Sequence, residues 1–380
     1  MTAQTIPNVM FPRSSLAKRH ERSRRTFLKE LGVSTGALVL AGTAAQAAAP
    51  PAPVWKNQIG IELFTVRNLL RQDYEGVLAK LAGIGYKEVE PADPYNNMEP
   101  KAYKALLDKY GLKMFSTHAG ATEGPNLEKE LEGQALMGIK YTEVRAGGRP
   151  GGPGRGSPSG PGGRAPAGPG APGGAGAPGG PPPQGGPGSP GEPGRAPGAA
   201  PGGGPFGPRA PQSVESVKTS CAQLNKYGAV VKKFGMKILI HNHAGEFELL
   251  DDGKTTQYDV FLKETDPELV TMQLDIGWAC IGGQDPIAMF KQNPGRYELW
   301  HVKDVKYKDL DPKLTPSQRQ RGARIVAMGE GDIDYKAVFA NAALAGLKYF
   351  VIEQDTAGQG GRDAIEDCRI AYDNLRTILS

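Results

Sequence analysis

Short apolar segments alternate with amphipathic, helix-like segments along most of this chain. The pattern occurs eight times, and each unit is a predicted strand followed by a predicted helix. Several units have a glycine between the helix and the next strand, as at Gly83, Gly111, Gly235 and Gly346, and glycine there is typical of a helix C-cap. Strict alternation predicts a parallel sheet, and eight units favour a closed (β/α)₈ TIM barrel over an open, doubly wound sheet.

The predicted elements are short and regularly spaced. The strands are residues 59–64, 86–90, 113–117, 141–145, 237–241, 270–275, 297–302 and 349–353. The helices are residues 74–82, 100–110, 127–137, 214–234, 259–264, 286–292, 335–345 and 362–379. In a parallel barrel the C-terminal ends of all strands meet at one face, and barrel active sites lie there. The residues at the strand ends are therefore the candidates for function.

A long segment between the fourth predicted strand and its helix does not fit into the barrel. Residues 147–211 are almost wholly Gly, Pro, Ala, Arg and Ser, so they have few apolar side chains to bury and cannot offset the entropy of ordering. A collagen-like triple helix needs Gly at every third position, and Pro182 breaks that phase. We expect a disordered Gly/Pro-rich insertion after strand 4, within a barrel that spans residues 58–380.

The N-terminus has the features of an export signal. Ser23-Arg24-Arg25-Thr26-Phe27-Leu28-Lys29 follows the twin-arginine pattern, residues 31–45 are apolar, and Ala45-Gln46-Ala47 is a small-residue cleavage site. The apolar run is shorter than the roughly 20 residues that a membrane-spanning helix needs, and an uncleaved anchor is the alternative. The sequence therefore predicts a signal peptide over residues 1–47, a linker over residues 48–57, the twin-arginine export machinery as a partner, and a periplasmic or otherwise exported protein.

The charge of the chain argues against a nucleic-acid partner. The formal net charge is +5, and residues 1–47 hold seven Lys/Arg and two Asp/Glu, which is the whole of that excess. Without the signal peptide the chain is close to neutral, whereas proteins that bind nucleic acids usually present a basic surface. The sequence leaves the oligomeric state open, including a homo-oligomer.

Histidines and acids gather at the ends of the predicted strands. Four of the five histidines lie at or just past the ends of strands three, five and seven: His118, His241, His243 and His301. Five acids lie in the same layer: Glu62, Glu90, Glu246, Asp275 and Glu353. Buried acids are costly unless they are paired or bind a cation. Mixed carboxylate and imidazole ligands suit Mn²⁺, Co²⁺, Zn²⁺ or Fe²⁺, and the alternative is a network of buried salt bridges.

Six segments of the chain resemble one known family. They are GIELFTVR (60–67), HNHAGEF (241–247), LDIGW (274–278), HVKD (301–304), GEGDID (329–334) and VIEQD (351–355). As an ordered set they resemble the sugar phosphate isomerase/epimerase family, which are the xylose isomerase-like TIM barrels. The resemblance runs from Ile59 to Leu379 apart from the insertion, and it implies the same barrel fold.

The resemblance also implies one divalent metal ion, held by residues from strands five to eight. The implied ligands on this chain are Glu246, Asp275, His301 and Glu353, and His241 is the rival of Glu246 for the ligand from strand five. The ion that such a site implies is Mn²⁺, Co²⁺, Zn²⁺, Fe²⁺ or Mg²⁺.

The chemistry that this resemblance implies passes through an enediolate. The metal polarises a carbonyl and lowers the pKa of the adjacent C–H, and two acids transfer the proton, for which Glu246 and Glu353 are the candidates. His118 and Lys303 are expected to hold hydroxyls or to stabilise the oxyanion. The expected substrate contacts are Glu62, Glu90, His243 and Trp278.

The motifs are specific for the superfamily and leave the substrate open. The first hypothesis is a metal-dependent isomerase or epimerase that acts on a small sugar or keto-sugar. The alternative keeps the barrel and the metal but ends in elimination or hydration, as a lyase or dehydratase (hydratase) of 3-keto-glycosides or keto-inositols. An endonuclease IV-like phosphodiesterase is disfavoured because the mature chain is near neutral. A non-catalytic sugar-binding barrel is the remaining alternative.

Overall fold

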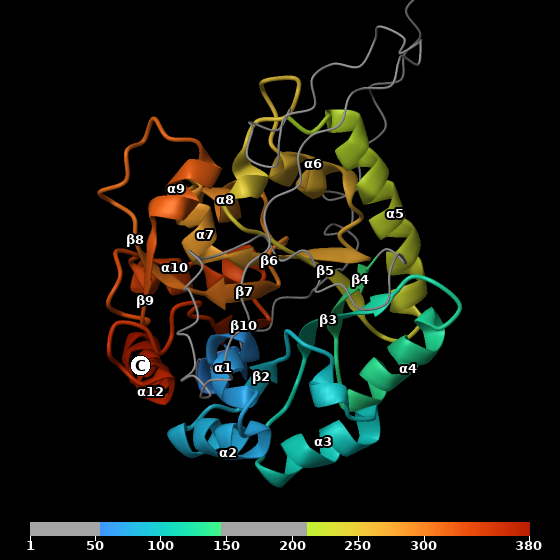
Figure 1. Cartoon of the computed structure of the whole chain (residues 1–380). Coiled ribbons are helices and arrows are strands. Elements are labelled where there is room, and N and C mark those ends of the chain that lie inside the picture. Colours follow the sequence, from blue (N-terminus) through green and yellow to red (C-terminus); the bar gives the residue numbers. More distant parts are fainter. Residues whose placement is uncertain (1–53, 146–210) are drawn as a thin grey trace, which may run out of the picture. The chain divides into compact units, whose positions relative to one another are not determined.

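The computed structural model describes residues 54–145 and 211–380 (Figure 1). The predicted signal peptide, residues 1–47, lies outside these ranges, and so does the predicted insertion except for Pro211. The export signal, the exported location and the disorder of the insertion therefore stay predictions. The last part of the predicted linker is described and forms the short 3₁₀ helix η1 (Val54–Asn57).

Eight parallel strands form a nearly closed barrel. Their order around the sheet is β2-β1-β10-β7-β6-β5-β4-β3. The strands are β1 (Gly60–Glu62), β2 (Glu88–Glu90), β3 (Ser116–Thr122), β4 (Tyr141–Arg145), β5 (Lys237–His241), β6 (Val270–Asp275), β7 (Leu299–Val302) and β10 (Tyr349–Ile352), and a separate pair is β8 (Asp304–Lys306) and β9 (Arg324–Val326). β2 and the segment before β3 meet through a parallel bridge between Glu88 and Lys113. The predicted TIM-barrel fold is confirmed.

Helices follow the strands along the chain and surround the barrel (Figure 1). The α-helices are α1 (Arg67–Leu70), α2 (Tyr74–Ile84), α3 (Pro100–Lys109), α4 (Leu127–Met137), α5 (Val214–Lys232), α6 (Gln257–Glu264), α7 (Ile276–Ile281), α8 (Pro286–Gln292), α9 (Pro316–Gly322), α10 (Tyr335–Ala340), α11 (Ala342–Ala345) and α12 (Ala364–Leu379). Further 3₁₀ helices are η2 (Leu63–Val66), η3 (Tyr95–Asn97) and η4 (Gly245–Phe247). No helix in the described ranges is both long and apolar enough to cross a membrane.

Side-chain caps explain where several of these helices begin. Asp73 accepts a hydrogen bond from a backbone N–H in the first turn of α2, and Ser213 does the same for α5. Thr256 and Asp259 form a reciprocal capping box at the start of α6. Such caps satisfy backbone donors that a helix leaves unpaired at its N-terminus, so the local sequence fixes these boundaries.

Five of the eight predicted strands have different bounds in the structure, among them the first and the third. The first, predicted over 59–64, is shorter because Leu63–Val66 turn into η2 directly after Glu62. The third, predicted over 113–117, lies further along the chain as β3. Gly83, expected to end a helix, lies inside α2, and Gly85 ends that helix with a φ of 129°. A positive φ favours glycine, so a glycine does end this helix, but it is the next glycine along the chain.

The stretch between β7 and α10 is more ordered than the long loop predicted there. It contains the antiparallel pair β8 and β9 and the short helix α9. The Asp304 carboxylate fixes this excursion, because its Oδ2 accepts hydrogen bonds from the backbone N–H groups of Gly329 and Gly331 at 2.9 and 2.8 Å. The helix predicted over 335–345 is broken into α10 and α11 at Asn341, whose side-chain amide donates to the carbonyl of Ala337.

Side chains fill the inside of the barrel in layers. Successive residues of a strand point to opposite sides, so Ile238 and Ile240 of β5 pack outward in the cluster shared with the helices, whereas Leu239 points inward. The inward apolar layer is a cluster of five buried residues: Phe115, Tyr141, Leu239, Leu299 and Val351. It forms the floor beneath the next inward-facing positions, which lie two residues further along each strand.

We expect Leu78→Ala to destabilise the barrel much more than Leu136→Ala. Leu78 of α2 is completely buried, whereas Leu136 of α4 is 55% exposed. Removing a buried Leu side chain costs about 2–5 kcal/mol because it loses apolar burial and leaves a cavity, whereas an exposed site changes stability by about 0.5 kcal/mol or less. Guanidinium unfolding of both variants measures the difference, and equal losses would contradict this assignment of the core.

Candidate metal centre

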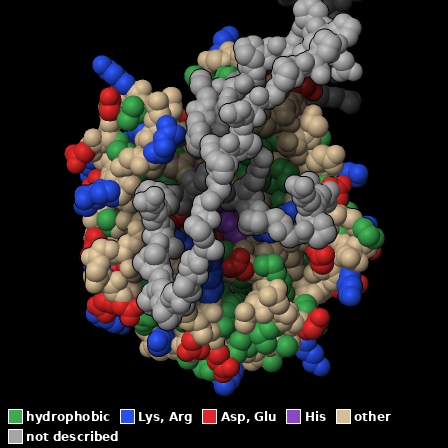
Figure 2. All heavy atoms as spheres, viewed as in Figure 1, with side chains coloured by type: hydrophobic (Ala, Val, Ile, Leu, Met, Phe, Trp, Pro, Cys, Tyr) green, Lys and Arg blue, Asp and Glu red, His purple; other side chains and the backbone are tan. Residues whose placement is uncertain are grey.

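The positions just above the apolar floor carry most of the predicted site residues. In β5, β7 and β10 the residue two places after Leu239, Leu299 or Val351 is His241, His301 or Glu353. Because the side chains of a strand alternate with a period of two, these three also point into the barrel. The space-filling view shows histidine at the centre of the visible face, with acidic and basic side chains beside it (Figure 2).

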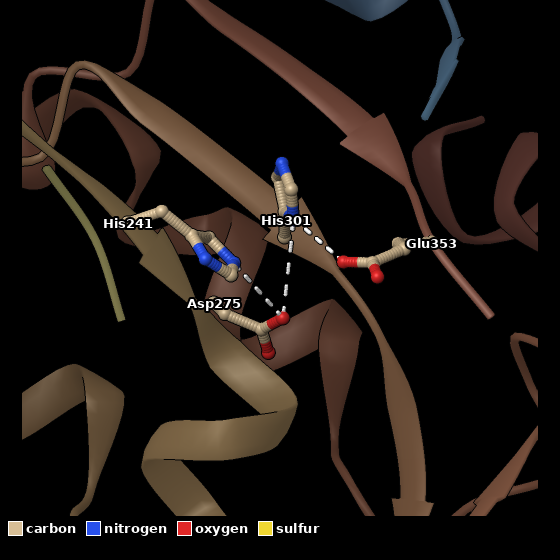
Figure 3. Close-up of side chains that lie close together, drawn as sticks. All are labelled: His241, Asp275, His301 and Glu353. Atoms are coloured by element: carbon tan, nitrogen blue, oxygen red, sulfur yellow. Dashed lines mark hydrogen bonds and ion pairs between the residues drawn. The ribbon is translucent and has the colours of Figure 1, made fainter. Parts of the chain in front are cut away.

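Four of these side chains form a group that could hold a metal ion. His241, Asp275, His301 and Glu353 each offer one ligand atom, and all of these atoms lie within 4.8 Å of one another. They come from the C-terminal ends of β5, β6, β7 and β10 and converge on one point (Figure 3). The parallel register helps, since it pairs Asp275 directly with His301.

The distances within the group suit a shared cation. The Oδ2 atom of Asp275 lies 3.5 Å from Nε2 of His241 and 3.9 Å from Nδ1 of His301. Both Asp275 Oδ2 and His241 Nε2 are buried without a hydrogen-bond partner among the described residues. Burial, reinforced by the positive charge of His301, lowers the pKa of His241 well below its ordinary value, so its imidazole is neutral, which is the form that binds metals. The side chains present therefore fit a divalent ion.

His301 lies at the centre of the acidic layer. Its Nδ1 is 2.7 Å from Oε2 of Glu353, and its Nε2 is 2.9 Å from Oε2 of Glu90. Burial alone would lower the pKa of this imidazole, but the nearby Glu62 and Glu90 carboxylates outweigh burial and hold it well above its ordinary value. In the metal-free site His301 is therefore a cation held between acids from β2 and from the end of β10.

Glu90 is fixed by contacts on both sides. The side-chain amide of Gln273 donates to both carboxylate oxygens of Glu90, each at 2.9 Å. The Oε1 atom of Gln273 also lies 2.7 Å from Nε2 of His118, and that nitrogen is 3.5 Å from Glu90. Burial would raise the pKa of Glu90, but the charges of His118 and His301 lower it to about 2. Glu90, His118 and His301 form the second group of possible metal ligands in the described ranges.

Lys303 is a completely buried cation beside the ligand group. Its Nζ contacts three carboxylates: Asp275 at 3.1 Å, Glu353 at 3.0 Å and Asp355 at 2.8 Å. Burial would lower the pKa of Lys303, but these acids hold it well above its ordinary value. The ammonium therefore stays charged and lowers the pKa of Glu353, whereas burial still raises the pKa values of Asp275 and Asp355. Lys303 has no exposed surface, and its contact with a substrate hydroxyl or oxyanion stays a prediction.

Glu62 and Glu353 differ in protonation although they lie close together. Burial and the charge of Glu353 raise the pKa of Glu62 well above its ordinary value. Burial acts on Glu353 in the same direction, but Lys303 and His301 outweigh it and hold its pKa well below the ordinary value. The layer thus offers a protonated acid and a charged carboxylate next to each other.

Glu246, the ligand that we favoured from strand five, lies outside the group of four. Its Oε2 accepts a hydrogen bond at 2.8 Å from the backbone N–H of His243, so the carboxylate folds back on its own loop at the start of η4. Burial raises the pKa of Glu246 as it raises that of Asp275, so the position of the carboxylate, and not its pKa, separates Glu246 from the group of four. The geometry therefore favours the rival, His241, which ends β5 itself.

The predicted substrate contacts are distributed around the same mouth. The ring of His243 is 5.1 Å from that of His241 and 5.7 Å from that of Trp278, measured between centroids. Trp278 of α7 is 2% exposed, and Nζ of Lys303 lies 4.7 Å from its ring centre. One face of this indole is thus already in contact with the protein, so Trp278 shapes the site more than it offers a stacking surface.

Three residues of the centre were missed in the sequence. Asn242 joins β5 to β6, since its Oδ1 accepts from the N–H of Asp275 at 3.0 Å and its Nδ2 donates to the Asp275 carbonyl at 3.3 Å. Gln273 and Asp355 each lie two positions from a predicted ligand, Asp275 or Glu353. The period-two rule for strands could have found both, whereas no local signal marks Asn242.

Comparisons with known proteins agree with the barrel fold. Residues 194–373 match the family described as "Xylose isomerase-like TIM barrel". The fold of this chain is a xylose isomerase-like TIM barrel. The resemblance seen in its motifs is confirmed.

Individual relatives are similar over different lengths. An inosose dehydratase of Clostridium perfringens (strain 13 / Type A) is 32% identical over 129 residues, which are 33% of this chain and 42% of the relative. A sugar phosphate isomerase/epimerase from Parabacteroides distasonis superposes with a TM-score of 0.55 at 20% identity, covering 88% of this chain and 99% of the other. The IOLI protein with a binding zinc atom superposes with a TM-score of 0.50 at 12% identity, covering 85% and 98%. This chain thus matches about two fifths of the length of the dehydratase and nearly the whole fold of the two structures.

We expect His241→Ala and Asp275→Asn to weaken the binding of Mn²⁺ at least about tenfold. Loss of a residue that only hydrogen-bonds to a metal ligand already costs about tenfold in affinity, so loss of a ligand itself should cost at least as much. Asn at position 275 can still cap α7, where Asp275 Oδ1 accepts from the N–H of Trp278. The matched control is Glu246→Gln, for which we expect unchanged affinity. Isothermal titration calorimetry measures all three, and a loss in Glu246→Gln as large as that in His241→Ala would restore Glu246 as the ligand.

We also expect metal binding to release a proton near pH 7. His301 is protonated in the metal-free site because its pKa lies well above the ordinary value, and an imidazole must lose that proton to bind a metal. The apparent affinity should therefore rise as the pH rises and fall as the pH falls. Calorimetric titration with Mn²⁺ in two buffers of different ionisation enthalpy gives the number of protons released, and wild-type binding without proton release would contradict the prediction.

Proposed function

We propose that this protein is a metal-dependent dehydratase of a keto-sugar or keto-cyclitol. The observation that carries the proposal is the group of His241, Asp275, His301 and Glu353 at the barrel mouth. The similarity to an inosose dehydratase supports elimination as the outcome of the reaction. Because the matched stretch spans 42% of that relative, both the substrate and the reaction are part of the proposal.

The group of four would hold one divalent ion. When bound, the ion supplies positive charge next to the carbonyl oxygen of the substrate, which lowers the pKa of the neighbouring C–H. Two imidazoles and two carboxylates suit Mn²⁺, Co²⁺, Zn²⁺ or Fe²⁺. The residues His241, Asp275 and Glu353 reach the site from three different strands, so the carbonyl would be oriented by the barrel itself.

The acids of the chain would move the protons. A dehydration needs a base for the proton next to the carbonyl and an acid for the leaving hydroxyl. Glu353 is the candidate base, since Lys303 at 3.0 Å helps to keep its carboxylate charged. Glu62 is the candidate acid, since its raised pKa lets it hold a proton. Neighbouring acids with pKa values pushed in opposite directions are typical of such pairs.

Lys303 would act as a positioning residue. Its Nζ holds Asp275, Glu353 and Asp355 in one arrangement through contacts of 2.8 to 3.1 Å. Buried carboxylates repel one another unless a cation lies between them. Lys303 therefore offsets part of the cost of placing Asp275 and Glu353 side by side: it holds the pKa of Glu353 well below its ordinary value, whereas burial still raises the pKa of Asp275.

Isomerisation or epimerisation, the first hypothesis from the sequence, is the alternative. It shares the removal of the proton next to the carbonyl and differs in the second step, because the proton returns to another carbon or face and no hydroxyl leaves. The motifs 60–67 and 351–355 that resemble the isomerase/epimerase family carry Glu62 and Glu353, and both outcomes use this pair. The two reactions are separated by their products.

Incubation of the Mn²⁺-loaded protein in D₂O with 2-keto-myo-inositol, fructose and a 3-keto-glucoside tests the proposal. We expect a product that has lost one water from at least one keto compound, detected by mass spectrometry. Deuterium incorporation next to a carbonyl without loss of water or aglycone would instead establish isomerisation or epimerisation. Neither exchange nor loss with any compound would contradict the catalytic proposal.

We expect Glu353→Gln to lower kcat at saturating metal by at least about 100-fold, the lower range of the contribution of a general base. The matched control is Glu75→Gln, because Glu75 is an exposed acid that contacts Lys109 on the outer surface. Initial rates at a metal concentration shown by calorimetry to saturate each variant measure the effect. Equal activity of Glu353→Gln and wild type would remove Glu353 from the reaction.

A further inference from the structure

A cavity of about 290 Å³ lies between the loops that follow β1 and β2. Leu63 and Pro91 contribute to its apolar wall. Its charged and amide side chains are Arg67, Arg71, Asp93, Asn96 and Asn97, and Tyr74 also lines it. Ligand pockets that bury a drug-sized molecule begin at about 300 Å³, so this cavity has room for one small ring. None of the residues that line it belongs to the metal centre.

The cavity adjoins the metal centre along the chain. Leu63 directly follows Glu62, and Pro91 directly follows Glu90. Glu62 and Glu90 lie 3.6 and 2.9 Å from the two ring nitrogens of His301. β1 and β2 therefore each end in an acid that contacts His301, and the residue that follows each strand lines the cavity. A molecule bound at the centre can extend over this side of the mouth.

Arg67 connects the cavity to the centre directly. Its guanidinium lies over the ring of Phe64, 4.0 Å from the centroid, and donates to the carbonyl of Asp355 at 3.0 Å. The carboxylate of Asp355 is 2.8 Å from Nζ of Lys303. Arginine has five donors in a fixed plane, and this packing orients those that remain free.

The loop after β2 is held in a costly conformation beside the cavity. Three consecutive residues that are not glycine, Tyr95, Asn96 and Asn97, have φ values of 42°, 52° and 56°. Each such residue costs roughly 1–2 kcal/mol. The hydroxyl of Tyr95 donates to Oγ1 of Thr117 at 3.4 Å and so holds the loop against β3, while Asn96 and Asn97 line the cavity. Strain of this kind is typical of binding loops.

The polar groups of the cavity match hydroxyls better than an anion. Arg71 and Asp93 form no ion pair with any described residue, and both are exposed. A site for phosphate or carboxylate would be opposed by the Asp93 charge. Planar donors and acceptors such as guanidinium, carboxylate and amide together serve hydroxyl groups that both donate and accept. The apolar residues Leu63 and Pro91 offer a surface for the C–H face of a sugar ring.

We propose that this cavity binds a second sugar ring, so that the substrate of the enzyme is a glycoside whose oxidised ring lies at the metal centre. The inference rests on the proposed function for the reacting ring, and it adds the substrate class. The ring at the metal centre takes part in the reaction. The ring in the cavity supplies binding energy through Arg71, Asp93 and Asn97.

Calorimetric titration of the full-length, Mn²⁺-loaded protein with single-ring and two-ring sugars tests this proposal. Glucose and myo-inositol represent one ring, and cellobiose, maltose and trehalose represent two. We expect at least one disaccharide to bind at least tenfold more tightly than either single ring. Binding does not require turnover, so this result is independent of the reactions in D₂O that test the proposed function.

Variants of residues that line the cavity test whether a preference for disaccharides over single rings arises there. Arg71→Ala and Asn97→Ala should each weaken disaccharide binding about tenfold, as loss of a hydrogen bond to a charged or well-placed group does, and leave the affinity for glucose unchanged. The control Arg376→Ala removes an arginine whose side chain is 69% exposed on α12 and should change neither. Thermal unfolding of each variant checks that it is folded.

Three results would overturn the inference. In the first, no disaccharide binds more tightly than the single rings. In the second, Arg71→Ala weakens glucose and disaccharide equally, which would mean that the residue acts at the metal centre. In the third, glucose 6-phosphate binds more tightly than every disaccharide, which would show an anion site.

Discussion

The imidazole of His301 is the contact on which the interior of the barrel mouth depends. It is completely buried, and its two nitrogens contact Glu90 and Glu353 on opposite sides at 2.9 and 2.7 Å. Each of these acids would be unfavourable alone, because a buried charge without a partner costs several kcal/mol. The imidazole of His301 thus connects β2 with the end of β10, and it is the partner of both Glu90 and Glu353.

The same interior carries more acids than its cations balance. Lys303 and His301 face Glu90, Asp275, Glu353 and other carboxylates in one completely buried layer. Some of these acids must therefore be protonated, or a further cation must join them. Asp275 Oδ2 and His241 Nε2 lack a hydrogen-bond partner among the described residues, and the nearest cation to Oδ2 is the Lys303 ammonium at 3.1 Å. The same charged groups therefore determine both the stability of the barrel mouth and the chemistry that it can carry out.

Most of the site residues that could be predicted from the sequence were found from the periodicity of the strands. Asp275, His301 and Glu353 end apolar strands, and the inward direction of their side chains follows from a period of two. The choice between Glu246 and its rival His241 stays a prediction, and the geometry favours His241. The sequence could not decide it, because it depends on where the Glu246 carboxylate folds after the strand has ended, and a hydrogen bond from the backbone N–H of His243 determines that. Partners distant in sequence, such as Asn242 with Asp275, have no periodic signature. For the same reason no element was predicted where β8 and β9 lie. Hydrogen bonds from Gly329 and Gly331 to Asp304 hold this pair in place.

The two carboxylate oxygens of Asp275 make different contacts. Oδ1 caps α7 through the N–H of Trp278 at 2.8 Å, and Oδ2 faces the imidazole of His241 at 3.5 Å. Whatever neutralises Oδ2 therefore also determines how firmly Oδ1 holds the first turn of the helix. Removal of a bound ion would therefore change the charge that Asp275 presents to the first turn of α7, the helix that carries Trp278. Occupancy of the centre and order at the rim are in this way coupled through a single side chain.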